Sequence, residues 1–183
     1  DGEVFYTDNQ GPWNGSSSLK HLKPGSFQGN PTGNKSFEIA ARKGISTGAL
    51  KQRPAEPRSG SRIVTERDTV AEFVPPAVVL PHGILGQSPT GLTFDRTGKF
   101  GPFSNQLFVA EQTFSLLQRV FLEKVNGVWQ GAAFHFLSGF GSGNIAILMT
   151  PDGVLYTGGS DRGWGAKGGK PFATRGSVKA LLR

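Results

Sequence analysis

A short segment that begins with a turn and continues as a strand recurs along this chain. Its copies are residues 1–7 (DGEVFYT), 105–110 (NQLFVA) and 152–157 (DGVLYT), and they lead to the acids Asp8, Glu111 and Asp161. Related apolar stretches at 91–95 and 144–149 precede the second and third copies, and equivalent positions lie 48 to 53 residues apart. Such repeats fold by packing against one another, because one unit alone cannot bury its apolar faces.

A repeat of roughly 40 to 50 residues made of several short strands is typical of a β-propeller blade, a four-stranded antiparallel sheet. We therefore expect an all-β fold. The strands of the best-defined unit are predicted at 91–94, 107–111, 116–123 and 128–137. Asn126-Gly127 predicts a type I′ turn between the last two strands, because both turn positions need positive φ. A further unit starts at Asn144 and turns at 151–153.

The repeat divides the chain into a partial propeller of about two to three blades. We assign residues 1–25 to an incomplete blade, 26–72 to a long insertion loop, 73–143 to a blade and 144–183 to the start of the next. The loop is polar and basic, with a helix signal limited to 36–43. Because propellers usually close with about four to eight blades, we expect the sequence to be a fragment.

Composition excludes several chemistries. The chain has 27 Gly and 12 Pro in 183 residues, an excess that supports many turns. It has no Cys, which excludes disulfides, thiolate zinc sites and haem attachment through Cys. No apolar run approaches the roughly 18 to 20 residues of a membrane-spanning helix, so no membrane span is expected. Residues 1–4 do not resemble the start of a signal peptide.

The net charge of +7 is concentrated in two zones, Lys20 to Arg67 and the residues after Asp161. Such zones favour anionic partners, or they are solvated loop charge. Only Phe27 and Phe37 lie among the basic residues of the first zone. Two aromatic rings are few for a base-stacking surface, so nucleic acid is not an expected partner.

Candidate site residues follow the predicted strands. Asp8, Asn9 and Gln10 come directly after the first strand, where propeller loops gather around the channel. Carboxylate and amide oxygens suit calcium, although Asp8 and Asn9 could equally cap a turn through bonds to the backbone. His82 is a candidate general base or a structural, hydrogen-bonded residue.

Several blocks of sequence resemble a known family. They are residues 5–11 (FYTDNQG), 19–31 (LKHLKPGSFQGNP), 75–83 (PPAVVLPHG) and 160–165 (SDRGWG). They resemble the propeller domain of the glucose/sorbosone dehydrogenase-like proteins. The resemblance is closest to large secreted proteins of planctomycete-type bacteria, in which a haem-binding cytochrome domain often follows. The tail at 173–183 departs from the pattern, in which another strand would be expected.

The resemblance implies a six-bladed quinoprotein propeller in the periplasm or outside the cell. Members with established activity are similar in using pyrroloquinoline quinone (PQQ), a calcium ion and a histidine base to take a hydride from a sugar or aldehyde. The family's histidine lies upstream of the matched region, so the resemblance gives that role to no residue here. Haem would belong only to a separate cytochrome domain, which is absent from this chain.

Asp161, Arg162 and Trp164 occupy, in the later unit, the place that residues 8–10 occupy in the first. We expect Asp8, Asn9 and Asp161 to bind the metal, and Gln10, Arg162 and Trp164 to bind the cofactor. Arg presents a planar fork to carboxylates, and Trp can stack on a flat ring. The alternative is a surface pair of Asp161 and Arg162, with Trp164 in blade packing.

Two functions stay open at this point. The first is quinone-dependent oxidation of a sugar or aldehyde by the whole propeller. The second is a non-catalytic propeller scaffold that binds polysaccharide or a partner protein through the basic segment from Lys20 to Arg67.

Overall fold

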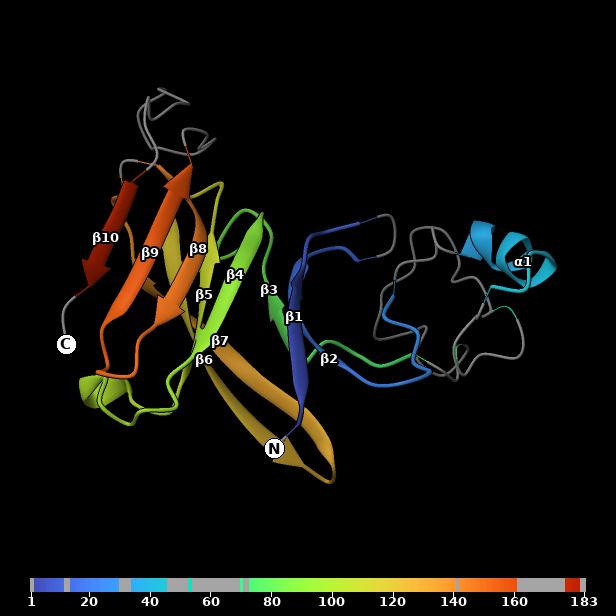
Figure 1. The fold of residues 1–183 in the computed structure, drawn as a ribbon, viewed down its shortest axis with the longest axis horizontal. Coiled ribbons are helices and arrows are strands. Elements are labelled where there is room, and N and C mark those ends of the chain that lie inside the picture. Colours follow the sequence, from blue (N-terminus) through green and yellow to red (C-terminus); the bar gives the residue numbers. More distant parts are fainter. Residues whose placement is uncertain are drawn as a thin grey trace.

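The computed structural model describes residues 2–11, 14–29, 34–45, 53, 70, 73–140, 142–160 and 177–181. Within them, three antiparallel sheets lie side by side, and one α-helix, α1 (Asn34–Arg42), lies apart from them (Figure 1). The fold is thus mainly β, as expected. None of the helical segments in these residues is long and apolar enough to cross a membrane.

The first sheet has the strand order β1-β2-β3, formed by β1 (Val4–Asp8), β2 (Ser17–Leu22) and β3 (Val78–Leu80). The expected unit boundary at residue 73 is wrong, because β3 pairs with β2 and not with the following strands. Phe27 and Phe73 form a parallel bridge, which brings the end of the long connection back beside the first sheet. Helix α1 lies in that connection and confirms the short helix expected near 36–43.

The second sheet has the order β4-β5-β6-β7 and matches the predicted unit closely. Its strands are β4 (Pro89–Phe94), β5 (Leu107–Glu111), β6 (Leu116–Val125) and β7 (Val128–Leu137). Asn126 and Gly127 join β6 to β7 with φ values of 49° and 79°. These positive angles confirm the predicted type I′ turn.

The third sheet has the order β10-β9-β8, formed by β8 (Gly143–Met149), β9 (Leu155–Ser160) and β10 (Ser177–Leu181). The expectation that the tail departs from the repeat is wrong, because β10 lies in the tail and pairs with β9 from Ser177↔Gly159 to Leu181↔Leu155. A five-residue strand gives little local signal, and its pairing partner lies on the far side of a long connection.

The second sheet is covered on both faces, and β5 shows this most directly. Successive strand residues point to opposite faces. On one face, Leu107 and Val109 pack with Leu19 and Leu80 of the first sheet. On the other face, Phe108 and Ala110 belong to a cluster that includes Leu155 of the third sheet. All five residues of β5 are consequently buried.

Asp95 anchors the loop that connects β4 to β5. Its buried carboxylate accepts hydrogen bonds from the backbone N–H groups of Thr97 (2.9 Å), Phe100 (3.4 Å) and Asn105 (3.2 Å), and from the Thr97 hydroxyl (2.6 Å). Burial acts to raise the pKa of Asp95, but these hydrogen bonds outweigh it and hold the pKa below its usual value. The ionised carboxylate thus organises the whole connection between the two strands.

We expect Asp95→Asn to lower the free energy of unfolding by about 2 kcal/mol at pH 7, because an amide nitrogen would face backbone donors. Because the pKa is lowered in the folded state, the ionised carboxylate contributes its full stability above the unfolded-state pKa of about 3.9. This contribution is lost as the pH falls through the folded-state pKa. The difference between the two proteins should therefore shrink at low pH. Urea unfolding at pH 7 and pH 3 measures it, with the exposed-strand variant Glu123→Gln as the control. A difference of the same size at both pH values would contradict this role.

Candidate functional site

The strands that carry the repeated segment end at one edge of the three sheets. β1 ends at Asp8, β5 at Glu111 and β9 at Ser160, and these ends lie toward the top of Figure 1. β1 is tied to the second sheet, because Thr7 Oγ1 donates to the carbonyl of Thr90 in β4 over 2.6 Å. Asp161, Arg162 and Trp164 lie outside the described residues, so their predicted roles stay predictions.

Asp8 is paired with a buried lysine. Lys20 Nζ lies 2.6 Å from Asp8 Oδ2, and Asn14 Nδ2 donates to the same oxygen over 3.2 Å. Lys20 Nζ also donates to the backbone carbonyl of Gln28. The Lys20 side chain is 1% exposed, whereas that of Asp8 is 27% exposed. The pair therefore fixes the start of the loop that follows β1.

Burial lowers the pKa of Lys20 from its usual value, while the hydrogen bond and the charge of Asp8 act in the opposite direction. The sequence predicts an exposed basic contact surface from Lys20 to Arg67. This prediction is wrong for Lys20, because its side chain is buried. The basic side chains that α1 exposes are Lys35 and Arg42. A contact through the rest of the basic segment stays a prediction.

A calcium site at Asp8 would need oxygen ligands beyond this carboxylate, and the predicted ligand Asp161 lies outside the described residues. Calcium takes about six to eight oxygen ligands. No cluster of three His, Cys, Asp or Glu side chains occurs within the parts of the chain that the structure describes. One oxygen of Asp8 already accepts from the Lys20 ammonium, which supplies the positive charge that a metal would otherwise provide. The donor set around Asp8 thus fits an internal ion pair.

Asn9 and Gln10 are exposed just beyond this pair. The backbone N–H of Gln10 donates to Ser17 Oγ over 3.3 Å, and Ser17 Oγ donates to the carbonyl of Gln87 over 3.1 Å. Ser17 therefore ties the loop after β1 to the segment that enters β4. The side chains of Asn9 and Gln10 are accessible to a ligand, and their roles as metal and cofactor contacts stay predictions.

His82 lies at the same edge, just beyond the end of β3. Its backbone N–H donates to Ser16 Oγ over 3.3 Å, and its side chain is exposed. Because β3 is two strands away from β1, His82 and Asp8 are separated by about 10 Å across the sheet. The structure thus places both residues at one edge without bringing them into contact. A role as general base stays a prediction.

Glu111, the acid at the end of the second copy of the repeated segment, has a structural role. It is fully buried, and its carboxylate accepts from the backbone N–H groups of Gln87 (3.1 Å), Ser88 (2.6 Å) and Phe114. These bonds hold the segment that enters β4 and the turn between β5 and β6. The last residue of the strand therefore carries an internal anchor in the second sheet, and an ion-paired acid in the first.

Comparison with known proteins shows the fold. No protein-family model matches the sequence, and no curated protein matches it. The structure is similar to the crystal structure of a protein from Thermus thermophilus named as an oxidoreductase (glucose dehydrogenase). The TM-score is 0.53 at 21% identity, over 98% of this chain and 41% of that one. The chain thus spans about two fifths of the length of the protein that it resembles.

We expect Asp8→Ala to lower the free energy of unfolding by about 3 to 5 kcal/mol, because it leaves the Lys20 ammonium buried without a counter-charge. Lys20→Met should cost less, since the partly exposed Asp8 can then be hydrated. Urea unfolding measures both. The control is Glu38→Ala, which removes an exposed pair with Arg53 at 3.7 Å and should change stability by less than about 0.5 kcal/mol. Equal losses of unfolding free energy in Asp8→Ala and Lys20→Met would contradict the argument that Asp8 neutralises a buried ammonium.

Proposed function

We propose that this chain forms part of a six-bladed propeller of the glucose/sorbosone dehydrogenase type that oxidises a sugar or aldehyde. The observation that carries the proposal is the likeness of almost the whole chain to a protein named as a glucose dehydrogenase. Within the described residues, the blocks of sequence that resemble the family include parts of β1, β2 and β3 and residues that follow these strands. A periplasmic or extracellular location and electron transfer to a cytochrome domain belong to this proposal.

In this proposal, the edge where β1, β5 and β9 end faces the cofactor. PQQ, when bound, supplies the two-electron acceptor for the oxidation. Gln10, Arg162 and Trp164 of this chain would contact it. Gln10 suits that role because its side chain is exposed while its backbone is held by Ser17. Asp8 has a different part, since its pair with Lys20 positions the loop that carries Gln10.

The test is reconstitution of the full-length protein with PQQ, with and without calcium. Quinone binding is followed by quenching of tryptophan fluorescence, and turnover by reduction of a dye with a panel of sugars and aldehydes. We expect both, and we expect Gln10→Ala to weaken quinone binding about tenfold through the loss of a polar contact.

The matched control is Gln130→Ala, which removes an exposed glutamine from β7 at the far end of the second sheet. It should leave quinone binding unchanged. Absence of quinone binding, or dye reduction with none of the substrates, would rule out the proposed oxidation. An equal loss in the two glutamine variants would remove Gln10 from the cofactor site.

A further inference from the structure

A hollow lies between the first and second sheets, at the opposite end of β1 from Asp8. β1 spans about 16 Å over its five residues, which separates the hollow from the edge described above. Its volume is about 720 Å³, within the range of small-molecule sites. It is lined by residues 2–5, at the start of the first sheet, and by all four strands of the second sheet.

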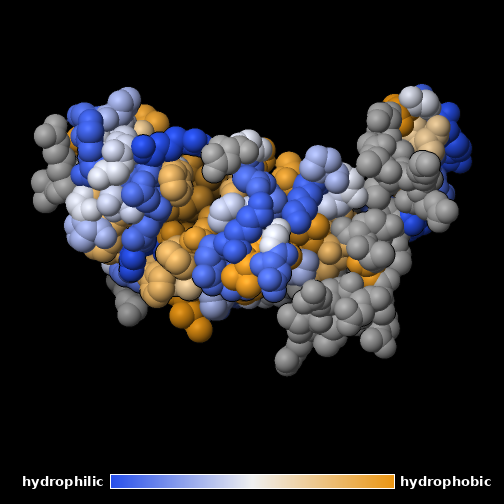
Figure 2. Space-filling model, turned by 90° about the horizontal axis from the view of Figure 1, so that it is seen from below, coloured by the Kyte–Doolittle hydropathy of each residue, from blue (hydrophilic) through white to orange (hydrophobic). Residues whose placement is uncertain are grey.

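The floor of the hollow is apolar. It consists of Phe5, Leu92, Leu107, Val120 and Leu122, which all belong to the apolar cluster between the two sheets or pack against it. Figure 2 views the molecule from this lower side and shows apolar side chains between hydrophilic ones. Because the floor offers no side-chain hydrogen bonds, a ligand that fills the hollow needs an apolar body.

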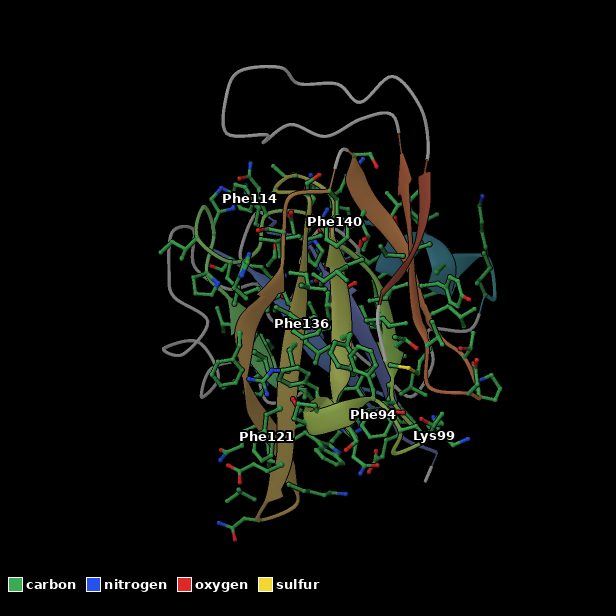
Figure 3. All side chains as sticks on the ribbon, turned by 90° about the vertical axis from the view of Figure 1, so that its left-hand side faces the viewer. Phe94, Lys99, Phe114, Phe121, Phe136 and Phe140 are labelled. Carbon is green, nitrogen blue, oxygen red and sulfur yellow. The ribbon has the colours of Figure 1, made fainter. Side chains whose placement is uncertain are left out.

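Phe94 adds an exposed aromatic ring. It pairs with Leu107, and directly paired residues carry their side chains on the same face of a sheet. The Phe94 ring therefore faces the first sheet, as Leu107 does. In Figure 3, Phe94 lies toward the lower end of the sheets, whereas Phe114 and Phe140 lie toward the other end. The Phe94 side chain is 42% exposed, so its ring is available to a ligand.

Arg96 and Asn105 lie at one end of the hollow, where β4 leads into its connection to β5. Both side chains are exposed. Asp95 holds the backbone of this connection, and its carboxylate is bonded to N–H groups within it, including that of Asn105. Within the described residues, no carboxylate pairs with Arg96. The Arg96 guanidinium is thus available for the carboxylate of a ligand.

Glu3 lies at the other end of the hollow, and its side chain is 31% exposed. Lys124 Nζ lies 3.0 Å from Glu3 Oε1, and His21 Nε2 lies 2.5 Å from Glu3 Oε2. Hydrogen bonds from Lys124 and then His21 lower the pKa of Glu3 to about 2, so the carboxylate is ionised at neutral pH. Each of its oxygens can accept a further hydrogen bond, which a hydroxyl group of a ligand can donate.

Trp129 of β7 forms the wall beside Glu3. Its ring meets the ring of Phe5 edge-on at a centroid distance of 5.5 Å, and Lys124 Nζ lies 5.6 Å from its centre. The wall is therefore packed against the first sheet without a ligand. Lys124, which holds Glu3, is on β6, and two strand spacings or about 10 Å separate β6 from the β4 side that carries Arg96.

We propose that this hollow binds a hydroxylated aromatic carboxylate, a planar ring with a phenolic hydroxyl at one end and a short chain that carries a carboxylate at the other. The carboxylate would pair with Arg96 and accept a hydrogen bond from the Asn105 amide. The ring would pack on Phe94 and the apolar floor, and the hydroxyl would donate to Glu3.

Three observations favour this ligand class over others. A sugar carries a hydroxyl group on nearly every carbon, whereas the lining has only three charged or amide side chains, Glu3, Arg96 and Asn105. A cation is disfavoured, because Lys124 already balances Glu3 and Arg96 adds a positive charge. The separation of the two polar ends suits a ring with a short side chain better than a single ring.

Isothermal titration calorimetry of the full-length protein tests the proposal with para-hydroxycinnamate, its methyl ester and unsubstituted cinnamate. The ester lacks the negative charge, and cinnamate lacks the hydroxyl. We expect para-hydroxycinnamate to bind about tenfold more tightly than the ester and about fivefold more tightly than cinnamate. No quinone is added, so failure of the proposed oxidation would leave this result intact.

Three variants assign the parts of the ligand to side chains. Arg96→Gln should remove the preference for the acid over its ester, and Glu3→Gln should reduce the preference for the hydroxylated acid to about twofold. Phe94→Ala should weaken the binding of both acids about fivefold. The first two effects are ratios between ligands, which a loss of stability would not change.

Matched controls separate the hollow from general charge and exposed rings. Arg42→Gln removes an exposed arginine from α1. Phe134→Ala removes a phenylalanine that is 45% exposed on the opposite face of the second sheet, since Phe134 pairs with Arg119 and Arg119 pairs with Phe108. Phe108 belongs to the cluster shared with the third sheet. Neither control should change the binding of para-hydroxycinnamate.

Several outcomes would overturn the proposal. They are equal binding of the acid and its ester, equal losses in Arg96→Gln and Arg42→Gln, and no binding of para-hydroxycinnamate. Tighter binding of glucose than of the acid would identify a sugar site instead. Loss of binding in the presence of saturating PQQ would place the acid at the quinone site and would also overturn the proposal.

Discussion

The arrangement of the described sheets depends on the burial of β5 on both faces. Its side chains alternate between two apolar clusters, one shared with the first sheet and one shared with the third. Fully burying a Leu, Val or Phe side chain contributes about 1.5 to 3 kcal/mol, so this short strand supplies a large part of the packing energy between neighbouring sheets. The order of the sheets follows, because the middle sheet alone, among the described ones, offers two buried apolar faces.

Buried carboxylates and one buried ammonium define the loops at the ends of the strands. Glu111 holds the segment that enters β4 and the turn after β5, and Asp95 holds the connection from β4 to β5. Asp8, the last residue of β1, pairs with Lys20 of β2. Each group is strongly held because hydrogen bonds to an ionised partner are about twice as strong as neutral ones. The exposed side chains at both edges, including Gln10 and Arg96, are therefore carried by loops with fixed backbones.

The middle sheet could be predicted strand by strand because its pattern is local. Its strands alternate or run apolar over several residues, and Asn126-Gly127 specifies the turn by itself. The two strands that were assigned wrongly, β3 and β10, are three and five residues long and pair across long connections. Their place depends on a distant partner strand, which local pattern does not reveal.

Part of the candidate site could also be predicted from the sequence, because its signal is local. The strand ends and their acids are visible in the repeat, so the sequence places Asp8 and Gln10 at the edge where these strands end. Burial of Lys20 was not visible, because a lysine in the segment SSLKHL looks like an outward-facing charge.

The outer parts of β6 and β7, beyond Val120 of β6, pair only with each other and form a two-stranded ribbon. Two paired strands without a third are only marginally stable in water, so this ribbon depends on its contacts with Glu3 and Phe5 of another sheet. The outer parts of β6 and β7 consequently keep their place only while the first and second sheets are packed together. The same contacts connect the two sheets at the end opposite to Asp8, so loss of either one would loosen both the ribbon and the joint between the sheets.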